Sequence, residues 1–201
     1  MAKTVLPEPT VYRSLGLGAL CETLEGTVAC KILELGPVRG ENIAFWSRYG
    51  PSVYIADLRS SLPLPVAAVD PDNPEVPEPD WEHILALPGD RRFDVILAWD
   101  LLNYLELPAA ASLIRYLSRF CRPGTMLFAL IFDQKQMPEA ITVYRIVDPG
   151  RLRYDCGSPA MRDCPRHQPR ALTGIMHQFR TANSFRLQNG LVEYLFSYEG
   201  H

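Results

Sequence analysis

The sequence lacks the marks of several classes of protein. Lys and Arg number 20 against 23 Asp and Glu, so a net charge of −3 gives no overall basic surplus of the kind that duplex nucleic-acid binding favours. No apolar run reaches the roughly 18 residues that cross a bilayer, and the first residues carry no apolar leader segment. The five cysteines are an odd number without a disulfide framework. We therefore expect a reduced, cytoplasmic protein that binds neither a membrane nor nucleic acid.

The composition is that of an ordinary globular chain. Hydrophobic residues make up 47% and charged residues 21% of the 201 residues, which is enough to bury a core in one domain over 1–201. The 18 prolines concentrate in loops. We expect an N-terminal arm over 1–10, a loop over 70–79, and an irregular insertion or cap over 133–168. The oligomeric state is left open.

Strand-like and helix-like patterns alternate along the chain. Residues 93–100 and 125–132 are almost continuously apolar, as in strands covered on both faces. Residues 108–121 between them have the spacing of an amphipathic helix. The other predicted strands are 29–35, 52–57 and 141–147, and the other predicted helices are 11–24, 41–49, 81–87 and 169–182.

The end of the chain has a different pattern. Residues 185–188 and 191–198 flank Asn189 and Gly190, a pair typical of a hairpin turn. Alternating strands and helices imply parallel strands with right-handed crossovers. The sequence therefore predicts an α/β fold: a doubly wound, mostly parallel sheet with helices on both faces, closed by an antiparallel hairpin.

The turn after the first predicted strand has the features of a ligand site. Gly36 and Gly40 begin and end it, and glycine lets backbone approach a ligand closely. Glu34 precedes the turn, and Asp57 ends the next strand, where a carboxylate can accept both hydroxyls of a ribose. An ordinary strand-to-helix turn is the alternative interpretation. With Asp57 in register, we expect a site for an adenosine-containing cofactor.

Three stretches resemble the class I S-adenosylmethionine-dependent methyltransferases. Residues 32–42 resemble the family's glycine motif, and 53–57 resemble its ribose-binding strand. Residues 93–105 with 122–127 resemble its fourth strand, helix and fifth strand. The resemblance covers about 11–132 and 169–199, and the closing hairpin fits the family's last strands.

The resemblance implies a Rossmann-like methyltransferase with S-adenosyl-L-methionine as cofactor and a small molecule or protein as methyl acceptor. It does not identify the acceptor. The residues that it places at the cofactor are Glu34, Gly36, Gly40, Asp57, Leu58, Asp100 and Leu101.

The chain departs from the family pattern in two places. Val38, preceded by Pro37, replaces the middle glycine of the motif and brings a Cβ to the turn. The acid that usually contacts adenine has no clear equivalent, and His83 or Ile84 could supply that contact. These departures motivate an alternative: a catalytically inactive module that keeps the fold and acts through a protein partner. A nicotinamide-dependent oxidoreductase fits less well, because the turn lacks the Gly-x-Gly-x-x-Gly spacing.

Methyl transfer needs alignment of donor and acceptor, exclusion of water and, for some acceptors, a base. The catalytic candidates are Asp100 and Tyr104, with His83 as a further base candidate. Asn103 could instead cap a turn, Tyr104 could simply pack, and Trp99 is expected in the core.

The loop over 156–167 contains two cysteines and a histidine. Its cysteines are eight positions apart and lack the close spacing of a structural zinc site, so we expect no metal. It is interpreted as a surface loop, or as a cap over 151–170 whose arginines shape the substrate site.

Overall fold

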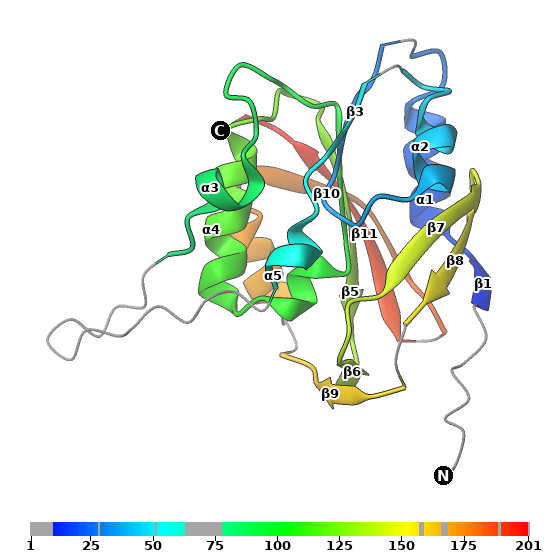
Figure 1. The fold of residues 1–201 in the computed structure, drawn as a ribbon, viewed down its shortest axis with the longest axis vertical. Helices are drawn as coiled ribbons and strands as arrows, with labels where there is room; N and C mark the ends of the chain where they lie inside the picture. Colours follow the sequence, from blue (N-terminus) through cyan, green and yellow to red (C-terminus); the bar gives the residue numbers. More distant parts are fainter. Residues whose placement is uncertain are drawn as a thin grey trace, which may run out of the picture.

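The computed structural model describes residues 10–27, 29–50, 52–62, 78–156, 159–165, 169–188 and 190–200. Its centre is a twisted sheet (Figure 1) built from β2 (Lys31–Glu34), β3 (Ser52–Ile55), β4 (Val95–Trp99), β5 (Met126–Phe132), β10 (Phe179–Arg186) and β11 (Leu191–Tyr198).

The strand order in this sheet is β10-β11-β5-β4-β2-β3. β3, β2, β4 and β5 are parallel, and β11 runs antiparallel to both β5 and β10. The predicted mostly parallel sheet with its closing hairpin is confirmed. Because the chain crosses from β3 over β2 to β4, the strand order reverses between β2 and β4, and ligands bind outside the carboxyl ends of strands at such a point.

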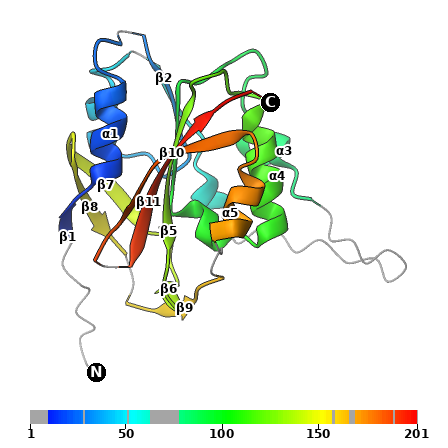
Figure 2. The same ribbon diagram turned by 180° about the vertical axis from the view of Figure 1, so that it is seen from behind.

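Helices cover both faces of the sheet (Figures 1 and 2). The strands alternate in side-chain direction, so Ile32 and Leu97 pack toward one face while Leu33 and Ile96 pack toward the other. On the first face lie α1 (Leu15–Thr23) and α2 (Gly40–Trp46), and on the second lie α3 (Trp81–Leu85), α4 (Leu107–Ser118) and α5 (Pro169–Ile175). None of the helices described is long and apolar enough to cross a membrane.

The segment predicted to be irregular, 133–168, contains strands. β7 (Val143–Asp148) and β8 (Arg151–Asp155) form a hairpin, and β6 (Gln136–Pro138) pairs with β9 (Met161–Asp163). The hairpin continues into a three-stranded sheet of order β1-β8-β7, in which β1 (Thr10–Arg13) is the edge strand.

Two predicted helices are wrong in part. Residues 11–13 form β1 rather than the first turn of a helix, and α1 begins only after Ser14, whose Oγ accepts a hydrogen bond from the Leu17 amide at 3.1 Å. The predicted helix over 169–182 ends at Ile175, because residues from Phe179 onward pair with β11. Most of the predicted loop over 70–79 and most of the 1–10 arm lie outside the described residues.

Gly16 allows α1 to approach the sheet. Its amide donates to the buried carboxylate of Glu193 at 2.7 Å, and a Cβ at Gly16 would lie 2.8 Å from the Phe128 ring. Gly16→Ala is therefore expected to lower the free energy of unfolding by about 1–3 kcal/mol, measured by urea denaturation. Gly18→Ala is the control: its Cβ meets nothing closer than 3.6 Å, so the variant should gain up to about 1 kcal/mol from helix propensity. Equal losses in both variants would contradict this account.

Candidate functional site

Three carboxylates follow the ends of the parallel strands at the point where the strand order reverses. Glu34 ends β2, Asp57 lies two residues after β3, and Asp100 follows β4 directly. In each of them one oxygen is buried without a hydrogen-bond partner: Oε2 of Glu34, Oδ1 of Asp57 and Oδ1 of Asp100. A buried acceptor without a donor is costly, so these three atoms suit a ligand that brings donors.

Glu34 is 3% exposed and its second oxygen is held firmly. Oε1 accepts a hydrogen bond from the Gly36 amide at 2.9 Å and another from the indole Nε1 of Trp99. Burial raises the pKa of Glu34 to about 7, although the hydrogen bonds from Trp99 and Gly36 act to lower it. The carboxyl group can therefore lose or gain a proton near neutral pH.

Trp99 reaches over the turn because β4 is irregular at its end. The β4–β5 register shifts between Leu97 and Trp99, and Trp99 has a left-handed φ of +48°, which is unusual for a residue with a Cβ. A Cβ at Gly36 would lie 2.9 Å from the indole Cδ1. The sequence predicts that Trp99 is in the core, and it is buried, but its indole fills the space that the glycine leaves open.

The β7 strand covers this indole from the other side. Tyr144 of β7 stacks on Trp99 with ring centroids 5.4 Å apart and planes within 7°. Asn42 of α2 fixes the strand, because its Nδ2 donates to the Tyr144 carbonyl at 3.1 Å and its Oδ1 accepts from the Ile146 amide at 2.9 Å. Sequence reasoning missed Asn42 and Tyr144, since contacts more than 100 positions apart leave no local pattern.

The other residues of the turn are less involved than the sequence implies. Val38, the residue that departs from the glycine motif, is 55% exposed, so its Cβ points away from the interior. Gly40 begins α2, and a Cβ there would meet nothing within 4 Å. The sequence suggests that the side chain of Val38 obstructs the turn, whereas in the structure the side chain beside Gly36 is the Trp99 indole.

Asp100 is completely buried behind β7. Its Oδ2 accepts a hydrogen bond from the Thr142 amide at 3.3 Å, and burial raises its pKa to about 7. Leu101, predicted beside it at the cofactor, packs into the core below α4. Asp100 thus lies at the carboxyl edge as predicted, with Leu101 directed away from it.

Asn103 and Tyr104 belong to the 3₁₀ turn Leu101–Tyr104. The Nδ2 of Asn103 donates to the carbonyls of Asp100 and Leu130, each at 2.8 Å, and its Oδ1 accepts from the Phe132 amide at 2.9 Å. Asn103 is therefore a clamp between this turn and β5, beyond the capping role considered from the sequence. The Tyr104 hydroxyl lies 3.1 Å from the Pro138 carbonyl, and burial raises its pKa.

Asp57 leads into the second 3₁₀ turn, Leu58–Ser61. Its backbone carbonyl accepts from the hydroxyl of Ser60 at 2.7 Å, while Oδ1 of its carboxylate has no partner. The amide of Leu58 donates to the Leu35 carbonyl at 3.0 Å and ties this turn to the one after β2. Leu58 itself is fully buried in the core.

A cavity of about 380 Å³ opens between the two 3₁₀ turns. Tyr104 and Ile141 contribute its apolar surface, while Arg59 and Arg162 bring positive charge. Ile141 of this lining precedes Thr142, whose amide donates to Asp100, so the cavity lies beside the buried carboxylate. The full lining is Arg59, Leu62, Tyr104, Glu139, Ala140, Ile141 and Arg162.

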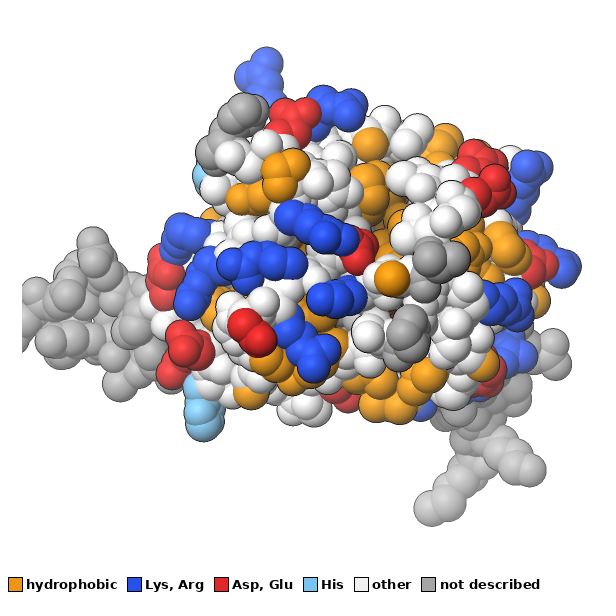
Figure 3. Space-filling model, turned by 90° about the horizontal axis from the view of Figure 1, so that it is seen from above, with side chains coloured by type: hydrophobic (Ala, Val, Ile, Leu, Met, Phe, Trp, Pro, Cys, Tyr) orange, Lys and Arg blue, Asp and Glu red, His pale blue; other side chains and the backbone are white. Residues whose placement is uncertain are grey.

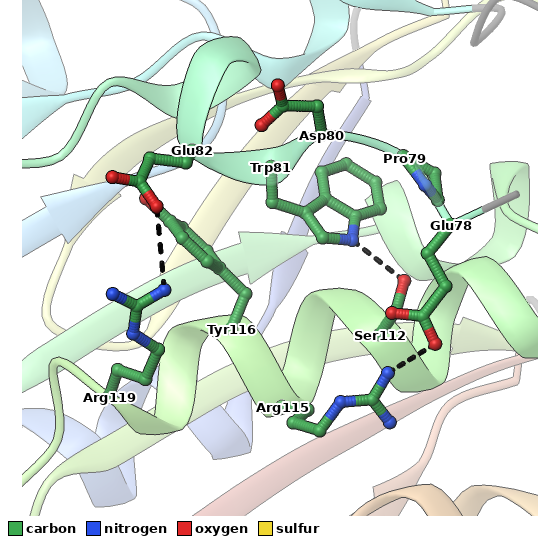
Figure 4. Close-up of a pocket in the computed structure, with 9 residues that line it drawn as sticks. All are labelled: Glu78, Pro79, Asp80, Trp81, Glu82, Ser112, Arg115, Tyr116 and Arg119. Carbon is green, nitrogen blue, oxygen red and sulfur yellow. Dashed lines mark hydrogen bonds and ion pairs between the residues drawn. The ribbon is translucent and has the colours of Figure 1, made fainter.

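A second cavity of about 380 Å³ lies between α3 and α4 (Figure 4). Its charged residues largely pair with one another: Arg115 with Glu78 at 2.5 Å and Arg119 with Glu82 at 3.8 Å. Trp81 is satisfied by the Ser112 hydroxyl at 2.8 Å. The Tyr116 hydroxyl in this lining is buried without a hydrogen-bond partner, but it comes from α4 and not from the carboxyl ends of the parallel strands, so we assign this cavity no ligand.

The remaining sequence candidates lie outside the carboxyl edge. His83 is exposed on α3, and its amide is capped by the Asp80 carboxylate at 3.0 Å. Within the described residues, Cys156 and Cys164 are free thiols and no group of metal-binding side chains is found. Lys and Arg side chains gather over the opposite, amino-end face (Figure 3), where Arg122 pairs with Asp94 and Arg180 with Glu199.

Comparison with known proteins supports the fold. No family model and no curated protein matches the sequence. Among solved structures, the chain is similar to the 1,6-didemethyltoxoflavin-N1-methyltransferase of Burkholderia thailandensis, with 15% identity over 92% of this chain and 77% of that chain and a TM-score of 0.50. It also matches an S-adenosylmethionine-dependent methyltransferase from Clostridium acetobutylicum, with 11% identity over 90% and 88% of the two chains and a TM-score of 0.47. The first likeness shows that the chain has the methyltransferase fold.

Proposed function

We propose that the protein is an S-adenosylmethionine-dependent methyltransferase. The observation that carries this proposal is the set of three carboxylates, Glu34, Asp57 and Asp100, each with a buried unpartnered oxygen at the carboxyl edge. The Burkholderia enzyme of the same fold was crystallised with S-adenosylhomocysteine, which supports a ligand of this class at the same edge.

The residues at this edge fit the cofactor in part. Asp57 has an oxygen free for the ribose hydroxyls, and the cavity beside Leu58–Ser61 leaves room on that side. The side over Gly36 is filled by the Trp99 indole, so binding of the whole cofactor requires this side chain to move.

The bound cofactor would supply a methyl group on a sulfonium, and the chain would align the acceptor with it and exclude water. Asp100, with a pKa of about 7, can take a proton from an oxygen or nitrogen acceptor near neutral pH. Tyr104, whose pKa is raised, keeps its proton and donates it to the carbonyls of Pro138 and Ala140, so its ring would position the acceptor as a fixed wall of the cavity. We leave the acceptor, a small molecule or a protein side chain, unassigned.

Isothermal titration calorimetry with S-adenosylhomocysteine tests the proposal. The wild type should bind, and Asp57→Asn should weaken binding by about 10- to 100-fold, because an amide accepts only one of the two hydroxyl hydrogen bonds well. Asp90→Asn, a change at an exposed turn before β4, should bind as the wild type does. Absence of wild-type binding at millimolar ligand would refute the proposal.

One observation favours a second candidate, an inactive module that works through a partner protein. The Trp99 indole is held over Gly36 by Glu34 and Tyr144 at once, as in a site that no longer admits a cofactor. An Asp57→Asn variant that retained the cellular function of the wild type would support this alternative.

A further inference from the structure

The two halves of the candidate site differ in how much room they offer. On the side of Asp57, the chain turns through Leu58–Ser61 and leaves a cavity lined by Arg59 and Leu62. On the side of Gly36, the space is filled by the Trp99 indole. A ligand that occupies both halves competes with Trp99, while a ligand confined to the Asp57 side does not.

The indole is held in this position by contacts on every side. Its Nε1 donates to Glu34, its face stacks on Tyr144, and it meets Phe128 edge-on with centroids 5.8 Å apart. Gly36 provides a surface without a side chain, and Ala at that position would collide with the indole. The left-handed backbone of Trp99 adds a local cost that these contacts offset. Trp99 is therefore a packed element of the folded chain.

Displacement of the indole has an electrostatic consequence. Once Trp99 leaves, Glu34 keeps the hydrogen bond from the Gly36 amide to its Oε1, while its Oε2 still has no partner. A ligand that takes the place of the indole regains the lost hydrogen bond only if it brings a donor of its own. The free energy needed to displace the indole weakens the observed affinity of such a ligand.

We propose that Trp99 is a built-in plug that divides the site, so that an adenine nucleoside binds at Asp57 with the indole in place and a ligand with a methionine chain binds only after the indole is displaced. This inference rests on the proposed function for the adenosine end of the ligand. It adds a selectivity that the three carboxylates do not provide: the folded chain favours a nucleoside such as adenosine over a nucleoside that carries a methionine or homocysteine chain.

The test compares two ligands on two proteins by calorimetry. The wild type should bind adenosine at least as tightly as S-adenosylhomocysteine. Trp99→Ala should bind S-adenosylhomocysteine about tenfold more tightly than the wild type and adenosine with a change of less than about threefold. Trp81→Ala, which removes a buried tryptophan of α3, is the control and should alter neither affinity.

The outcomes separate this inference from the proposed function. If neither ligand binds the wild type, the proposed function fails. If the wild type prefers S-adenosylhomocysteine and Trp99→Ala weakens it, Trp99 is a cofactor contact and the plug is refuted while the function stands. If Trp99→Ala gains no affinity for S-adenosylhomocysteine, the plug is also refuted.

A second variant covers the case in which Trp99→Ala does not fold. Trp99→Phe retains an aromatic ring against Tyr144 and loses only the donor to Glu34 and part of the ring. It should bind S-adenosylhomocysteine about threefold more tightly than the wild type does. The fluorescence of Trp99 in a Trp46→Phe, Trp81→Phe background gives an independent measurement: S-adenosylhomocysteine should shift the emission to longer wavelength and adenosine should not. If neither ligand shifts the emission at concentrations that calorimetry shows to be saturating, the inference that Trp99 is a plug is refuted.

Discussion

Glu34→Gln is expected to raise the free energy of unfolding at pH 8 by about 3 kcal/mol. In the folded chain the pKa of Glu34 is raised from 4.5 to about 7, chiefly by burial. Each unit of this shift corresponds to about 1.4 kcal/mol. Glutamine keeps an oxygen for the Gly36 amide and the Trp99 indole and never has to carry a charge into the interior, so the penalty disappears.

The sign of the pH dependence follows from the direction of the shift. Between pH 4.5 and about 7 the folded state holds a proton on Glu34 that the unfolded state has lost. The stability of the wild type therefore falls as the pH rises through this window, and the penalty is complete above it. Asp100, whose pKa is also raised to about 7, contributes in the same direction, beginning near its ordinary value of 3.8.

Urea denaturation at pH 5 and pH 8 measures this effect. The wild type should be less stable at pH 8, and Glu34→Gln and Asp100→Asn should each remove part of the difference. A gain in Glu34→Gln that is equal at the two pH values would contradict the prediction, because it would reflect packing rather than charge. A ligand that donates to the orphaned oxygens should stabilise the wild type more at pH 8 than at pH 5.

The same carboxylates show how far the sequence predicts the site. Apolar runs such as 93–100 identify strands buried on both faces, and the order of strands and helices then determines where their carboxyl ends meet. Glu34, Asp57 and Asp100 could be placed at one edge on this basis, and the structure brings them there. The fold was accessible from the sequence because it depends on repeated patterns of many residues.

The position of the Trp99 indole over Gly36 could not be predicted in this way. Trp99 packs on the same face as Val95 and Leu97, as alternation along β4 predicts. Its reach over Gly36 goes with the register shift and the left-handed backbone at the end of β4, which no residue pattern reveals. The stacking partner, Tyr144, arrives from a strand whose position depends on Asn42 of α2. The sequence instead indicated Val38 as the obstacle in the glycine turn, because a motif compares residue types and contains no information on which side chains are exposed.

Asn103→Ala is expected to destabilise the protein by about 3 kcal/mol. The amide of Asn103 is buried and makes three hydrogen bonds, two as a donor to the carbonyls of Asp100 and Leu130 and one as an acceptor from the Phe132 amide. Alanine removes all three, and each buried backbone group that loses its partner costs about 1–3 kcal/mol, some of which local water or relaxation recovers.

The Asn103→Asp variant separates the two hydrogen bonds that Asn103 donates from the one that it accepts. Aspartate can still accept from Phe132, but it has no donor for the two carbonyls, so it should lose at least as much stability as alanine at pH 8. Asn183→Ala, at an exposed position of β10, is the control and should change the stability by less than about 0.5 kcal/mol. A loss of less than about 1 kcal/mol in Asn103→Ala would mean that the clamp contributes little.

The clamp also connects stability to the site, because the turn that Asn103 ties to β5 carries Asp100 at its start and Tyr104 at its end. Loosening this turn moves the buried carboxylate and the wall of the cavity together. Asn103→Ala should therefore weaken binding of adenosine and S-adenosylhomocysteine alike when measured below its unfolding temperature, whereas Trp99→Ala should separate the two ligands. Unchanged binding of both ligands in a folded Asn103→Ala protein would show that the position of the turn does not govern the site.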